Sequence, residues 1–215
     1  MPTISAPAKP FKLTFAHNAI WGIYNGSSLP GGSGLWGVSV HSLGQDEGYR
    51  WVVHNLSTSV RQMDLELGYT GLMIRRPFGI AVHNYWLYLS ISGGLLLKWK
   101  IDASGHVDSG SMVYSVVIYE YYDIKIYENE IYCLDAHTES QAHILRVYDF
   151  DFNFVREFPI SEITHTASTM AINNGLIYID DRSGFYTGGR MKIYTTTGDF
   201  VETVNLNLGS VNTIN

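Results

Sequence analysis

Short apolar segments separated by polar turns run along the whole chain, and their positions alternate with the period of a β-strand. In residues 170–180, the segment Met170-Ala-Ile leads into Asn173-Asn-Gly175, and Leu176-Ile-Tyr-Ile follows. An Asn-Gly pair between two such segments is a strong hairpin signal, because both central residues of a type I′ turn need positive φ. The pattern therefore predicts a β-hairpin here.

The same strand, turn and strand pattern occurs three more times, in residues 13–23, 80–89 and 124–134. Each copy has one aromatic anchor, and the four anchors are Trp21, Tyr88, Tyr132 and Tyr178. The last three anchors are 44 and 46 residues apart, and the first interval of 67 residues is one period plus an insertion. A basic residue then follows in the next segment of three copies, and the alignment puts these at one register: Lys98, Arg146 and Lys192.

Four strands in about 45 residues are typical of one blade of a β-propeller. We therefore predict an all-β fold, a β-propeller of about four blades with four antiparallel strands each. An N-terminal arm (1–10) precedes a single propeller domain (11–215), whose blades cover about 11–56, 77–118, 122–160 and 168–208. Residues 57–76 form an insertion between the first two blades. Helical periodicity is confined to residues 57–67 and a single turn near 160–163.

Three of the copies resemble the NHL-type propeller repeat. The resemblance rests on Ile80-Ala-Val, Leu87-Tyr-Leu and Leu97-Lys-Trp-Lys-Ile101, and on their counterparts at 131–149 and 177–194. It implies a blade and says little about what the protein does. Two arrangements stay open, a closed four-bladed ring and an open arc that another subunit completes.

The composition fits this fold and excludes several classes of protein. Of the 215 residues, 46% are hydrophobic and 16% are charged, below the roughly 25% of an average soluble domain. Blades pack on both faces, which leaves fewer positions for charge. A chain this apolar is not disordered. A net charge of −6 excludes nucleic-acid binding through a broad basic face.

Processing signals are also missing from the sequence. The single cysteine, Cys133, excludes an internal disulfide. Residues 1–12 contain no apolar signal-peptide core, and the longest apolar stretches are far shorter than the roughly 20 residues of a membrane span. We expect synthesis in a cytoplasm and no membrane insertion, with assembly into a virus particle as an option.

No catalytic constellation emerges, and we predict no catalytic residue, cofactor or metal. The resemblance to propeller hydrolases would imply a Ca²⁺ in a central channel, held by inner-strand carboxylates at Asp135 and Asp181, with Asp180 beside them. These are too few for the six to eight oxygen ligands that Ca²⁺ takes. The pairs His17-Asn18 and His83-Asn84 recur at a turn position, which favours a role in the turn, and His54-Asn55 is a third such pair.

Two groups of residues are candidates for partner or ligand binding. The insertion contributes Tyr69, Arg75 and Arg76, and an aromatic patch contributes Tyr119, Tyr121 and Tyr122. Insertions in repeat proteins often carry binding surfaces, and exposed Tyr side chains act as sugar platforms or protein hot spots. The alternative for the aromatic patch is propeller core, since aromatics suit strands.

These observations favour a non-enzymatic structural or protein-interaction propeller within an oligomeric assembly. A phage or virus particle component, such as a tail, nozzle, hub or adaptor part, is the assembly that we expect. One alternative is a carbohydrate-binding propeller for attachment to a host surface, in which case the partner is a glycan. A second alternative is a lactonase- or esterase-like hydrolase.

Overall fold

The structure of the chain is a computed structural model, which forms two compact units, residues 1–120 and 121–215. It describes residues 10–16, 19–24, 36–42, 51–56, 77–91, 94–101, 107–117, 119–135, 143–164, 167–181 and 189–206. In the strands before residue 77, and at residues 77, 107 and 109, the description covers the backbone alone. The insertion 57–76, the helical candidate within it and most of the N-terminal arm lie outside the described residues.

The N-terminal unit contains two four-stranded antiparallel sheets in which each strand pairs with the next one in sequence. The first sheet consists of β1 (Pro10–Ala16), β2 (Ala19–Tyr24), β3 (Trp36–Ser42) and β4 (Trp51–Leu56). The second consists of β5 (Pro77–His83), β6 (Trp86–Ile91), β7 (Leu95–Ile101) and β8 (Val107–Val116).

The C-terminal unit repeats this arrangement with two more sheets. One consists of β9 (Tyr121–Tyr127), β10 (Glu130–Asp135), β11 (Ile144–Tyr148) and β12 (Phe154–Pro159). The other consists of β13 (Met170–Asn173), β14 (Leu176–Asp181), β15 (Arg190–Thr195) and β16 (Phe200–Asn205). The expected all-β fold of four-stranded antiparallel sheets is confirmed, and the described residues contain no helix.

Three two-residue turns join the first and second strands of the described hairpins. Their central residues all have positive φ, namely Asn84 and Tyr85, Glu128 and Asn129, and Asn174 and Gly175. The predicted role of these polar residues in turns is therefore confirmed. The aromatic anchors Tyr88, Tyr132 and Tyr178 each stand two residues after the pair that closes the turn, so they are equivalent positions.

The predicted common register of the three basic residues is wrong for Lys98. Arg146 pairs with Cys133 and Lys192 pairs with Ile179, in both cases one residue beyond the aromatic anchor. Lys98 instead pairs with the anchor Tyr88 itself. Because a shift of one residue moves a side chain to the other face of a sheet, Lys98 lies on the opposite face from the equivalents of the other two.

A hydrophobic core fills the space between the two sheets of the C-terminal unit. Tyr132, Leu134, Leu145 and Val147 supply one side, and the facing sheet supplies Ile177, Ile179 and Tyr194. Each of these side chains is at most 1% exposed. Since side chains alternate along a strand, residues 178 and 180 of β14 lie on the face turned away from this core.

The connection after β12 is closed by its own hydrogen bond. The amide of Ile163 donates to the carbonyl of Ile160 at 3.1 Å, so the expected single turn at 160–163 is present. Both side chains join the core of the C-terminal unit. Among the described residues there is no helix that could cross a membrane.

Candidate functional site

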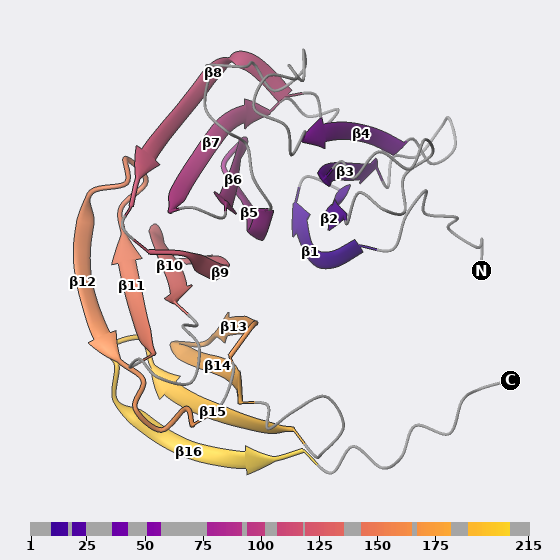
Figure 1. Cartoon of the computed structure of the whole chain (residues 1–215). Coiled ribbons are helices and arrows are strands. Elements are labelled where there is room, and N and C mark those ends of the chain that lie inside the picture. Colours follow the sequence, from indigo (N-terminus) through magenta and orange to yellow (C-terminus); the bar gives the residue numbers. More distant parts are fainter. Residues whose placement is uncertain are drawn as a thin grey trace, which may run out of the picture. The chain divides into compact units, whose positions relative to one another are not determined.

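A buried carboxylate connects the two sheets of the C-terminal unit through their first strands, which lie next to each other (Figure 1). Asp123 of β9 is fully buried. One of its oxygens accepts from the amide of Ile124 at 3.0 Å and from Lys125 Nζ at 2.9 Å. The other accepts from Thr169 Oγ1 at 3.1 Å and from the amide of Met170 at 2.9 Å, across the junction. This bonding compensates for burying a charged group.

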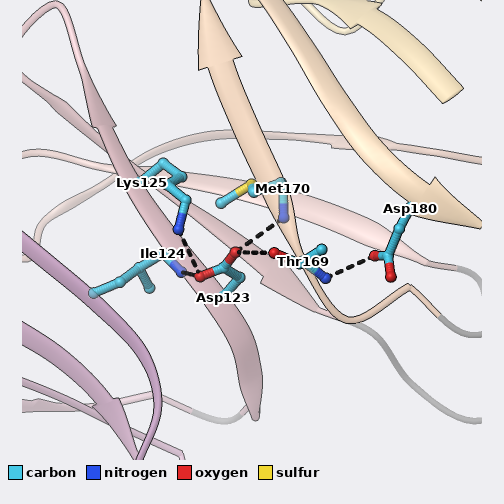
Figure 2. A network of polar contacts seen from close by, with 6 residues as sticks. All are labelled: Asp123, Ile124, Lys125, Thr169, Met170 and Asp180. Carbon is cyan, nitrogen blue, oxygen red and sulfur yellow. Dashed lines mark hydrogen bonds and ion pairs between the residues drawn. The ribbon is translucent and has the colours of Figure 1, made fainter. Parts of the chain in front are cut away.

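A second carboxylate continues the network on the far side of Thr169, as Figure 2 shows. Asp180 Oδ1 accepts from the amides of Ser168 and Thr169 at 2.8 and 2.7 Å. Its Oδ2 accepts from Ser168 Oγ at 3.1 Å. Three donors in different directions leave the carboxylate little rotational freedom. Asp180 is therefore held in one orientation at the start of β13.

An open pocket of about 190 Å³ lies beside Asp180. Its walls come from β13, β14 and β15, and from the residue after β16. They are formed by Thr169, Met170, Ala171, Tyr178, Asp180, Met191 and Leu206. Most of the lining is apolar, and a few polar groups converge on it, which is the usual composition of a small-ligand site. The sequence did not reveal this pocket.

The carboxylates considered for Ca²⁺ have other partners in the structure. Asp135 accepts from Arg146 Nη1 at 2.6 Å, and Asp181 lies 3.4 Å from Arg190 Nη2 and 3.9 Å from Lys192 Nζ. Asp180 points to the opposite face of β14 from Asp181. Within the described part of the chain, no three His, Cys, Asp or Glu side chains come together as a metal site.

The aromatic patch is divided between different environments. Tyr121 is 1% exposed and its hydroxyl hydrogen bonds to that of Tyr148 at 2.6 Å, so it does not lie on the surface of the chain. Tyr122 is half-buried and packs against the core of the C-terminal unit, and Tyr119 is also half-buried. The candidates of the insertion lie outside the described residues: Tyr69, Arg75 and Arg76.

The sequence contains one signal for the Asp123 network that we did not use. Asp123 and Thr169 each stand four residues before the end of the first strand, at Tyr127 and Asn173. They are therefore the same repeat position in neighbouring sheets. Two hydrogen-bonding residues at one repeat position indicate a contact across the junction when those strands are adjacent.

We expect the protein to lose stability in alkali. Burial, aided by the hydrogen bond and charge of Glu130, raises the pKa of Tyr132 from 10.0 to about 12. Burial also raises the pKa values of Tyr121 and Tyr194. Between about pH 10 and 12 the unfolded chain has lost protons that the folded chain keeps, so the free energy of unfolding falls as the pH rises. Below about pH 10 this contribution is complete.

Urea unfolding followed by tryptophan fluorescence at a series of pH values measures this effect. The midpoint should be constant to about pH 9.5 and then decline. Tyr132→Phe should lower the midpoint slightly at pH 7, through loss of its bond to Glu130, and should make the alkaline decline shallower. A decline equally steep in wild type and variant would show that Tyr132 does not contribute.

No protein-family model matches the chain, and no curated protein matches it. Among solved structures, a functionally unknown protein from Desulfotomaculum acetoxidans DSM 771 has a TM-score of 0.51 and 13% identity, over 87% of this chain and 54% of that one. The computationally designed Ika4 protein has a TM-score of 0.44 and 9% identity, over 65% of this chain and 79% of that one. A eukaryotic initiation factor has a TM-score of 0.45 and 8% identity, over 92% and 55%. The first likeness shows a shared overall fold alone, and this chain spans about half the length of that protein, 54%.

Proposed function

We propose that the protein is a non-enzymatic, structural β-propeller that works as one part of an oligomeric protein assembly. The observation that carries this proposal is a pair of exposed apolar residues on the outer strand of each sheet in the C-terminal unit. Phe154 and Val155 of β12 are 57% and 44% exposed, and Phe200 and Val201 of β16 are 41% and 47% exposed. Exposed apolar groups on edge strands attract another protein surface.

The two apolar pairs are equivalent positions that follow the same turn. In the first, the Asp149 amide donates to the carbonyl of Asn153 at 3.0 Å, and in the second the Thr195 amide donates to that of Asp199 at 2.8 Å. The ring of each Phe stacks edge-on against a Tyr of the neighbouring strand. Contacts within the sheet therefore fix both rings while one side stays open.

The buried charged groups of the C-terminal unit support a non-enzymatic role, because they hold strands together. Arg146 bonds to Asp135 and Glu157, which lie on the two neighbouring strands of the same sheet. Lys192 bonds to Thr203 and lies near Asp181 in the corresponding strands of the next sheet. Groups engaged in this way support the fold and are not displayed to a substrate.

The propeller itself is supported by the equivalence of the sheets. Four meanders of the same strand order occupy the parts of the chain where the four repeats were predicted. In the C-terminal unit, the first strand of one sheet contacts the first strand of the next, as in blades around an axis. A virus particle is the assembly that the sequence favours, and its test is detection of the protein in purified particles by mass spectrometry.

Sedimentation velocity on the purified chain tests the assembly directly. We expect a species that is a multiple of 24.1 kDa in the micromolar range. The double variant Phe154→Ser/Phe200→Ser should dissociate it while keeping the far-ultraviolet spectrum of the wild type. The matched control is Tyr85→Ser, which removes an aromatic ring that is 51% exposed from a turn of the other unit and should leave assembly unchanged. A wild-type chain that stays at 24.1 kDa throughout, or equal assembly of the double variant, would overturn the proposal.

A further inference from the structure

The pocket beside Asp180 lies on the face of β13–β16 that is turned away from the core of the C-terminal unit. In the preceding sheet, the positions equivalent to Tyr178 and Met191 are Tyr132 and Leu145, which are buried by the neighbouring sheet. Here Tyr178 and Met191 are only half-buried. An aromatic ring and a thioether that are core elsewhere in the repeat therefore line an open pocket.

The polar side of the pocket is prepared in advance for hydrogen bonding. Asp180 is fixed by the amides of Ser168 and Thr169 and by the hydroxyl of Ser168. Each carboxylate oxygen has two lone-pair directions, so Oδ2 keeps acceptor capacity beyond its single printed donor direction at Ser168 Oγ. A fixed carboxylate is suited to accept hydroxyl donors whose spacing is also fixed, since neither partner then loses much freedom on binding.

The remaining walls are apolar and face the same opening. Met191 and Leu206 add to the Tyr178 ring, and the Leu206 side chain is 37% exposed at the rim. The amide of Leu206 donates to the carbonyl of Gly189 at 2.8 Å, which anchors this rim to the start of β15. A ligand that matches these walls has a flat C–H face and hydroxyl groups at its edge, which describes a pyranose ring.

We propose that this pocket binds one hexose unit of a glycan, with its C–H face on Tyr178 and its hydroxyls on Asp180. Stacking on an aromatic face and a charge-assisted hydrogen bond would both contribute, and the open shape of the site fits weak binding to single sugars. The pocket is separate from the exposed Phe and Val pairs, so the loss of either role would leave the other intact.

Methyl NMR of the full chain, labelled with ¹³C at its methionine methyl groups, tests the site. Methyl glycosides of glucose, galactose, mannose and N-acetylglucosamine serve as probes, each titrated to millimolar concentration. We expect the signal of Met191, assigned through Met191→Leu, to shift saturably with at least one glycoside. Tyr178→Ala should raise its Kd about tenfold, whereas Tyr178→Phe, which keeps the ring, should leave the Kd within about threefold.

Two further variants keep the test decisive if Tyr178→Ala does not fold. Asp180→Asn keeps an acceptor for the two amides and should weaken glycoside binding about tenfold, as expected for loss of a charge-assisted bond. Tyr85→Ala removes an exposed Tyr of the other unit and should leave the Kd unchanged. The inference is overturned if no glycoside shifts Met191 saturably, if Tyr178→Phe and Asp180→Asn bind as Tyr85→Ala does while Tyr178→Ala also binds normally, or if only N-acetyl-arginine amide shifts the signal.

Discussion

Replacing Arg146 with Met should lower the free energy of unfolding by about 4 kcal/mol. Arg146 is 3% exposed and bonds to Asp135, whose side chain is 5% exposed, at 2.6 Å. Its Nε also donates to Glu157 at 2.9 Å. Removal of the guanidinium leaves the Asp135 charge buried, and Asp135 Oδ1 already has no hydrogen-bond partner among the described residues. An uncompensated buried charge is costly because it has lost its water without gaining another partner.

Chemical denaturation of wild type and three variants measures this effect. Arg156→Met is the matched control, since Arg156 and Glu130 form a similar pair at 2.6 Å whose side chains are 35% and 26% exposed. Water screens that pair, so its loss should cost about 1 kcal/mol. In the double variant Arg146→Met/Asp135→Leu, most of the lost stability should return, because no charge stays buried. Equal losses for Arg146→Met and Arg156→Met would contradict this account.

Gly198→Ala should lower the free energy of unfolding by about 3 kcal/mol or more. Gly198 has φ of +98°, and a Cβ at this position would lie 2.6 Å from Cγ and 2.8 Å from Cβ of Phe158. Phe158 is 8% exposed and belongs to the core between the two sheets. The added methyl group therefore meets a ring that has no free direction in which to move, and the backbone conformation is itself strained for alanine.

Gly175→Ala separates these two costs. Gly175 has φ of +75°, but a Cβ there would meet no atom within 4 Å. It should therefore carry only the cost of the left-handed backbone, about 1 kcal/mol. Phe158→Leu should restore part of the stability of Gly198→Ala, and a double-mutant cycle by thermal or urea unfolding gives that coupling. If both glycine variants lose the same stability, the contact with Phe158 is unimportant.

The hairpins could be predicted from the sequence because turn chemistry is local. Positive φ at Asn174 and Gly175 follows from the residue types, and the aromatic anchors Tyr132 and Tyr178 fall at the same distance from their turns. The register of Lys98 could not be predicted in this way. Its position depends on how the connection between β6 and β7 closes, which alternation within one strand does not determine.

The candidate site depended on contacts across the chain, and sequence reasoning missed most of it. Both Asp135 and the basic residue Arg146 were recognised as repeated, but their pairing across neighbouring strands was not considered. The bond between Asp123 and Thr169 joins residues 46 positions apart, and it requires the first strands of two sheets to be adjacent. The pocket at Tyr178 needs four strands to be placed before it exists.

The central claim is that the four repeats are blades of one propeller that acts as part of an assembly. A reconstruction of the purified assembly by electron cryomicroscopy tests it most directly. The account predicts four four-stranded sheets around a common axis in each chain, with Phe154 and Phe200 at contacts between protein subunits. Sheets without a common axis, or those two side chains facing solvent in every subunit, would contradict it.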